Sequence, residues 1–188
     1  MKKSIGIAIC CLMLSLSVCG SAFADRVTLP KTGQTAVIAT GDDGTYKKGM
    51  AWPSPRFTDV GDGTVKDNLT GLTWLKNANC FGTQAWVAAL TSANTLASPA
   101  CNLTDGSAAG QWRLPSSNEL ASLVDLSSYM PALPTGHPFT TVQPTNYWSG
   151  STYAGTTTYA WLVNMGVGSV VYNSKAFGYY VWPVRSGQ

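Results

Sequence analysis

The sequence predicts a single α+β domain with two short helices, small antiparallel sheets and long loops. Two segments, 82–98 and 117–125, carry apolar residues at helical spacing. The stretch 130–144 is rich in proline and glycine, which excludes a helix or an interior strand and predicts a long surface loop. Shorter segments rich in β-branched and aromatic residues lie between turns and are predicted strands: 57–59, 64–66, 72–75, 146–150, 157–165, 166–173 and 178–185.

The second helix and the last strands have the clearest local signals. Ser116 followed by Glu119 forms a capping box, which predicts a helix starting at Ser117. Pro183 cannot donate a ladder hydrogen bond, so the last strand is expected at an edge or to end its pairing there. Alternating residues are expected to share one face of a strand: Tyr159, Trp161, Val163 and Met165.

The first 24 residues predict a secretory signal peptide that is cleaved before Asp25. Two lysines precede an uncharged apolar stretch, 5–18, and the sequence Ala-Phe-Ala at 22–24 fits a cleavage site. The apolar stretch is about 14 residues long, too short for the roughly 20 that span a bilayer. An exported protein without a transmembrane anchor follows, located in the periplasm, at the cell surface or outside the cell. A lipoprotein signal in which Cys19 is acylated stays open as an alternative.

After the signal, residues 25–55 predict an extended arm with turns at 41–44, and residues 56–188 a single globular domain that packs with it. Without the two lysines of the signal, the 12 Lys and Arg of the chain become 10, against 9 Asp and Glu. This balance provides no basic field for a nucleic-acid backbone, so no nucleic-acid partner is expected.

Outside the predicted signal the chain has two cysteines, Cys80 and Cys101, which bracket the first helical segment. An even pair in an exported chain predicts a disulfide that joins the two ends of this segment, with two free thiols as the alternative. Trp86 and Leu90 lie at helical spacing in the segment, and Thr83 is its predicted N-cap.

The inventory of reactive side chains predicts a protein without catalytic residues, metal or cofactor. Outside the signal there is one histidine, His137, and one glutamate, Glu119, which the capping box already uses. Asp59, Asp62 and Asp67 could suggest a calcium loop, but their spacing does not match the EF-hand, and turn formation is the preferred interpretation.

The chain is instead rich in aromatic and amide side chains, which is the chemistry of sugar binding. Four tryptophans lie in apolar patterns that favour the core: Trp74, Trp86, Trp112 and Trp161. Five aromatic residues lie beside turns, where core and binding roles stay open: Trp52, Tyr147, Trp148, Tyr153 and Tyr172. The candidate ligand-binding residues are Asn146, Tyr147, Trp148, Tyr153, Lys47 and Lys48.

Six motifs occur in an order that resembles the Lcl C-terminal-type domain, named for a Legionella collagen-like adhesin. They are WPSPRFTDVGDGTVKDNLTGLTWLKNANC, WRLPSSNELASLVD, GHPF, YWSGSTYA, YAWLVNMGVG and YYVWPVR, within residues 28–188. The chain is more distantly similar to the formylglycine-generating-enzyme and C-type-lectin-like group. That similarity implies a compact C-type-lectin-like domain with two helices flanking small antiparallel sheets, in which Arg113 and Glu119 belong to the scaffold.

The resemblance implies an adhesion or binding module. The domain of the named adhesin is associated with trimer formation and with sulfated glycosaminoglycans as ligands. Outside the signal, Lys47 and Lys48 are the one adjacent basic pair, and the reactive cysteines and calcium motifs of the distant group are missing. The leading hypothesis is therefore a non-enzymatic exported module that recognises a glycan or an envelope protein. A structural, self-associating homotrimer and an enzyme on a formylglycine-generating-like scaffold are the alternatives.

Overall fold

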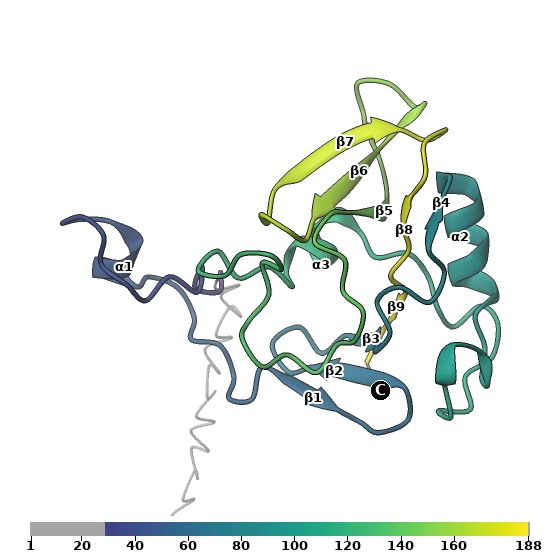
Figure 1. Cartoon of the computed structure of the whole chain (residues 1–188), viewed down its shortest axis with the longest axis horizontal. Helices are drawn as coiled ribbons and strands as arrows, with labels where there is room; N and C mark the ends of the chain where they lie inside the picture. The colour runs from purple at the N-terminus through teal and green to yellow at the C-terminus, as the bar shows by residue number, and fades with distance from the viewer. Residues whose placement is uncertain (1–28, 188) are drawn as a thin grey trace, which may run out of the picture.

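The computed structural model describes residues 29–187, and Figure 1 shows their arrangement. The predicted signal peptide, including Cys19, and the first residues of the predicted arm lie outside the described residues. Within the described part of the chain, no helix has the length and apolar character that a bilayer crossing requires. The few helices and two small sheets confirm the predicted α+β class.

The arm, residues 29–55, leaves the body of the protein and returns to it (Figure 1). A β-bridge between Pro30 and Met50 closes this excursion. The arm is not purely extended as predicted, because the expected turn begins a one-turn helix, α1 (Asp43–Tyr46). Asp42 caps it by accepting from the Thr45 amide at 2.9 Å. Backbone N–H donors, that of Ile38 first, lower the pKa of Asp42 to about 2.

The first sheet has the order β1-β2-β3-β9 and is antiparallel throughout. Its strands are β1 (Phe57–Asp59), β2 (Thr64–Asp67), β3 (Thr73–Leu75) and β9 (Val184–Arg185). The first three match the predicted strands closely. Strand β9 begins directly after Pro183, so the predicted strand 178–185 is interrupted there. It is last in the sheet order but is not a free edge, because a β-bridge joins Val184 to Arg113 on its other side.

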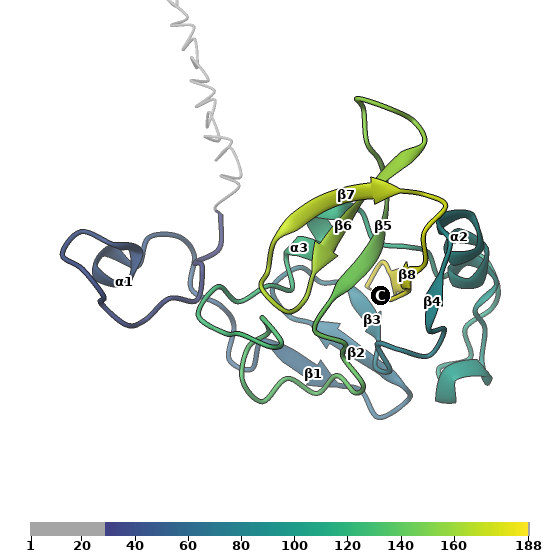
Figure 2. The same ribbon diagram turned by 45° about the horizontal axis from the view of Figure 1, so that its top comes forward.

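The second sheet has the order β4-β8-β5-β6-β7 and lies across the molecule from the first (Figure 2). Its strands are β4 (Thr83–Gln84), β5 (Asn146–Thr152), β6 (Tyr159–Asn164), β7 (Val170–Ser174) and β8 (Tyr179–Tyr180). Strands β5 and β8 run parallel, with Tyr147 opposite Tyr180. The expectation of wholly antiparallel sheets is therefore wrong at this one pair.

Helix α2 (Trp86–Thr95) forms within the predicted segment, but Thr83 is not its cap. Thr83 pairs with Tyr180 in β4, and Ala85 takes the N-cap position without a side-chain hydrogen bond. The predicted disulfide between Cys80 and Cys101 is confirmed and encloses α2. A 3-10 turn, η1 (Ala100–Asn102), follows α2 and contains Cys101.

Helix α3 (Ser117–Ala121) has the predicted capping box. The Ser116 hydroxyl accepts from the Glu119 amide at 3.2 Å, and a Glu119 oxygen accepts from the Ser116 amide at 2.8 Å. The helix ends at Ala121 rather than at the predicted Asp125. The Asp125 carboxylate instead accepts from the Ser127 amide at 2.8 Å in a turn.

Two apolar clusters form the core. The larger one joins the first sheet, α3 and the inner part of the second sheet, and the smaller one lies between α2 and the second sheet. Trp74 and Trp112 are fully buried, as predicted. Trp86 and Trp161, also predicted in the core, stay partly exposed. The predicted long loop 130–144 is confirmed, although it contributes Leu133 and Phe139 to the larger cluster.

Candidate functional site

The structure buries two of the predicted ligand-binding residues, and this corrects the prediction. Tyr147 and Trp148 are both 0% exposed, because apolar clusters cover both faces of β5. The Tyr147 hydroxyl accepts from the Gln143 amide at 2.8 Å, and burial raises the pKa of this phenol. The Trp148 indole donates to the Gln84 carbonyl at 2.8 Å. Neither ring has a free face for a ligand.

The remaining predicted residues separate into different regions of the surface. Asn146 accepts a hydrogen bond from Asn164 at 2.9 Å and so links β5 to β6. Tyr153 belongs to a surface cluster of aromatic rings, described below. Lys47 lines a cavity beneath the arm, whereas its neighbour Lys48 is exposed and does not line that cavity.

The surface cluster, here called the aromatic patch, comprises Tyr153, Tyr159, Trp161 and Tyr172. The rings of Tyr153 and Tyr172 stack with centroids 4.1 Å apart and an interplanar angle of 3°. Trp161 meets both of them edge-on, with centroids at 5.4 and 5.6 Å. Tyr172 is 48% exposed. The patch therefore presents tyrosine edges and one accessible ring to solvent at the outer strands of the second sheet.

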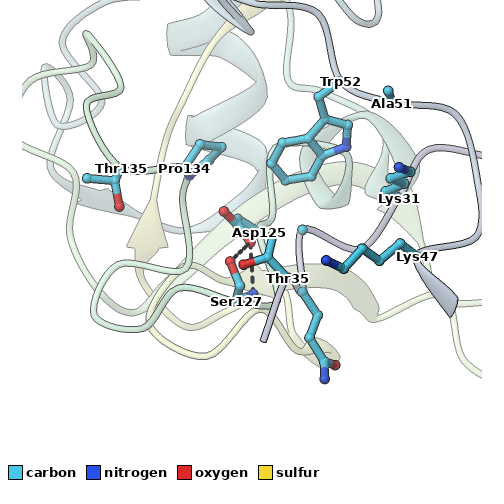
Figure 3. Close-up of a pocket in the computed structure, with 11 residues that line it drawn as sticks. Lys31, Thr35, Lys47, Ala51, Trp52, Asp125, Ser127, Pro134 and Thr135 are labelled. Atoms are coloured by element: carbon cyan, nitrogen blue, oxygen red, sulfur yellow. Dashed lines mark hydrogen bonds between the residues drawn. The ribbon is translucent and has the colours of Figure 1, made fainter. Parts of the chain in front are cut away.

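The cavity beneath the arm, here called the arm cavity, has a volume of about 420 Å³ (Figure 3). Its walls come from two segments that are far apart in sequence, the arm and the loop 125–135. The Leu126 amide donates to the Thr32 carbonyl at 3.0 Å and fastens the arm to this loop. The arm thus supplies one wall of the cavity and the body of the protein supplies the other.

Gly33 permits this close approach. Its backbone has a φ of 93°, a conformation that L side chains rarely adopt. A Cβ atom there would collide with the Asp125 carboxylate and lie 3.1 Å from the Trp52 ring. A side chain at position 33 would therefore separate the arm from the loop.

Two lysines give the arm cavity positive charge. Lys31 and Lys47 both line it, and within residues 29–187 neither ammonium group forms an ion pair. Lys47 is the C-cap of α1, with a left-handed backbone whose amide donates to the Asp43 carbonyl. The fold of the arm thus sets the direction of the Lys47 side chain, which extends into the cavity in Figure 3.

An aromatic ring and one carboxylate complete the lining. The Trp52 ring points into the same space as the Asp125 carboxylate (Figure 3), and the Arg56 guanidinium covers the ring at 4.7 Å from its centroid. The Trp52 indole nitrogen is buried and has no hydrogen-bond partner among the described residues. Asp125 is 6% exposed and is oriented by hydrogen bonds from the amide and hydroxyl of Ser127.

These groups can bind a polar ligand with acidic substituents. An indole offers an apolar face for a sugar ring, ammonium groups attract carboxylate or sulfate, and a fixed carboxylate accepts from hydroxyls. In the part of the chain that the structure describes, no three His, Cys, Asp or Glu side chains are placed to hold a metal ion. The lining offers aromatic, charged and hydroxyl-bonding groups to a ligand.

Sequence reasoning identified Lys47 and left the role of Trp52 open, but it missed Lys31, Gly33 and Asp125. The fragment Asp-Leu-Ser at 125–127 is a recognisable Asx-turn signal, and it could have shown that Asp125 ends α3 early. No local pattern indicates that the arm folds onto a loop about 90 residues later.

Comparison with known proteins gives one result. The Lcl C-terminal domain family matches residues 63–185. This range contains the helices α2 and α3 and every strand of the two sheets except β1. A search of proteins with curated functions finds no match.

Proposed function

We propose that this chain, which belongs to the Lcl C-terminal domain family, is an exported module that binds an acidic glycan in the arm cavity. The family indicates an adhesin-like module. The choice of an acidic ligand rests on Lys31 and Lys47, which line the cavity beside the Trp52 ring and whose ammonium groups form no ion pair within residues 29–187. An envelope protein is the other ligand class compatible with an adhesin-like module.

Export is supported by the disulfide and by the predicted signal peptide. Stable disulfides form and persist in oxidising compartments. The Cys80–Cys101 bond joins residues 21 positions apart on either side of α2. The periplasm, the cell surface and the extracellular medium all satisfy this condition. A location outside the cytoplasm is also where a protein meets glycans.

Binding rather than catalysis is the proposed activity, because Glu119 and the two cysteines of the described chain already have structural roles. Both Glu119 oxygens pair with Arg113 at 2.7 Å, and the Arg113 hydrogen bonds lower the pKa of this carboxyl. Glu119 is therefore ionised and engaged, which does not suit a general acid. Cys80 and Cys101 are joined to each other, which argues against a reactive cysteine pair of the formylglycine-generating type.

A glycan panel tests the proposal. The purified protein should bind polymers with carboxylate or sulfate groups more tightly than neutral ones, and the affinity should fall between low and physiological salt. Trp52→Ala should remove this binding, whereas Tyr172→Ala in the aromatic patch should leave it unchanged. Equal loss in both variants, or binding only to neutral sugars, would rule out the arm cavity as the site.

The aromatic patch favours a second candidate function, association with a protein. Tyrosine and tryptophan are enriched at protein interfaces, and β7 is a sheet edge with exposed Val170 and Tyr172. A homotrimer formed through this edge would make the protein a structural subunit. Light scattering with molar-mass determination distinguishes a self-associating subunit from a monomeric binding module. A monomer at tens of micromolar contradicts self-association, whereas a trimer that the substitution Tyr172→Ala dissociates supports it.

A further inference from the structure

A second, smaller cavity of about 170 Å³ lies between the start of β1 and the loop 134–138. Arg56 and Phe57 line one side, and His137 lines the other. We call it the Arg56–His137 pocket. It shares the backbone segment 134–135 with the arm cavity, but the two lysines and the Trp52 ring of that cavity are not part of it.

Arg56 is held by several contacts and still has one nitrogen without a partner among the described residues. Its Nε and Nη2 atoms donate to Asp67 at 3.1 and 3.2 Å, and Nη2 also donates to the Ser122 carbonyl at 2.6 Å. The rings of Trp52 and Phe57 lie 4.7 and 4.8 Å from the guanidinium carbon. Only 5% of the side chain is exposed, and Nη1 is buried without a partner among the described residues.

His137 lines the same pocket and also keeps one nitrogen without a partner among the described residues. Its backbone amide donates to the Pro134 carbonyl at 3.2 Å, and its ring lies 5.9 Å from that of Phe139. The Nδ1 atom is buried and has no partner in residues 29–187. Buried polar atoms in folded proteins are almost always hydrogen-bonded, so two residues that line one small cavity and each keep a buried nitrogen without a partner among the described residues point to a ligand that supplies oxygen atoms.

We propose that the Arg56–His137 pocket binds a carboxylate, which accepts hydrogen bonds from Arg56 Nη1 and from the protonated His137 ring. The carboxylate can belong to a free small acid or to an acidic sugar. A carboxylate is favoured over a neutral oxygen because both unused groups can be cationic donors, and charge-assisted hydrogen bonds are the stronger kind.

The charges around the pocket make the binding depend on pH. Asp67 already neutralises Arg56, so the second positive charge must come from His137. Tyr129 lines the neighbouring surface beside His137 and is the remaining titratable side chain there. Burial lowers the pKa of His137 below its ordinary value of 6.5, and a bound carboxylate would oppose this by stabilising the imidazolium. Binding therefore takes up a proton and is tighter at low pH.

The single histidine of the chain allows a direct test by NMR. The His137 Cε1 signal of the purified protein is followed from about pH 8 to about pH 4.5 with acetate, with glucuronate, and with neutral acetamide, at constant ionic strength. The proposal predicts that a carboxylate raises the pKa of His137 by at least about half a unit and that acetamide does not. A much lower half-saturation for glucuronate identifies an acidic sugar as the source, and a preference for acetate identifies a small acid.

Two variants and one contact measurement complete the test. Arg56→Lys keeps the charge beside Asp67 but lacks Nη1 and should abolish the response, whereas Arg113→Lys, at a surface ion pair, should retain it. Nuclear Overhauser effects from the acetate methyl to His137 and Phe57 report occupancy in the wild type, independently of whether Arg56→Lys folds. An unchanged His137 titration, an equal response to acetamide or in Arg56→Lys, or no such contacts would overturn the proposal. None of these results depends on glycan binding in the arm cavity.

Discussion

Replacing Asp67 with asparagine should destabilise the protein by about 3 to 5 kcal/mol, the usual cost of removing one partner from a buried ion pair. Asp67 is 0% exposed and accepts from Arg56 at two nitrogens, from the Leu69 amide at 2.9 Å and from the Thr70 hydroxyl at 2.9 Å. Asparagine keeps the shape but supplies one acceptor atom instead of two, and its NH₂ group cannot accept from any of these donors. The Arg56 charge would stay buried without its counterion.

Urea denaturation followed by tryptophan fluorescence measures the loss, which should appear as a lower midpoint at unchanged slope. The matched control is Arg56→Met/Asp67→Asn, which removes both charges and should be less destabilised than the sum of the two single variants by about 0.5 to 3 kcal/mol. A loss below about 1 kcal/mol in Asp67→Asn, or strictly additive single variants, would refute the reasoning that this pair is energetically coupled.

Three further predictions concern the fold and its pH dependence. Replacing Cys80 and Cys101 with serine should lower the free energy of unfolding by about 3 kcal/mol for this loop length, and equal denaturation midpoints with and without the disulfide would contradict it. Glu119 has a lowered pKa, so its contribution to the free energy of unfolding is complete above its ordinary pKa and is lost as pH falls through the lowered value. Glu119→Gln should therefore reduce the loss of stability at acid pH. Parallel curves of unfolding free energy against pH for the two proteins would count against this. His137 also has a lowered pKa, so the wild type should lose stability as pH falls from 6.5 toward the pKa of His137 in the folded state. His137→Asn should remove this dependence of the melting temperature on pH. An unchanged dependence would show that burial of His137 is not its cause.

The features that the sequence predicted correctly depend either on contacts between near neighbours or on residue properties that hold wherever the residue lies. The capping box of α3 is complete within four residues, so Ser116 and Glu119 predict it without knowledge of the fold. The disulfide follows from cysteine count and compartment. Pro183 lacks a donor wherever it lies, so its place just outside β9 was also predictable.

The features that the sequence missed depend on distant partners. Thr83 is a reasonable helix cap by local pattern, but pairing with Tyr180 places it in a strand. Tyr147 and Trp148 follow a loop and looked accessible, yet α2 and Trp182 pack on the two sides of their strand. Predicting this burial needs the positions of both clusters, which hydrophobic patterns along one strand do not provide.

The candidate site was predicted least well, because it exists only where the arm meets the body. The fit of Gly33 against Asp125 brings together residues that are 92 positions apart in the sequence. Lys47 was found as half of a basic pair, although only one member of the pair lines the cavity. The charge pattern therefore indicated Lys47 as a candidate residue but not the geometry that places Lys47, and not Lys48, at the cavity.

The most direct test of the arm cavity compares Lys47→Asn with Lys48→Asn by calorimetric titration with a sulfated or uronic-acid polymer. The two variants lose the same charge from adjacent positions, and asparagine tolerates the left-handed backbone at position 47. We expect Lys47→Asn to weaken binding about tenfold or more, equivalent to about 1.4 kcal/mol, and Lys48→Asn to bind like the wild type. Equal weakening in both variants would contradict it, since binding would then follow the net charge of the arm rather than the cavity.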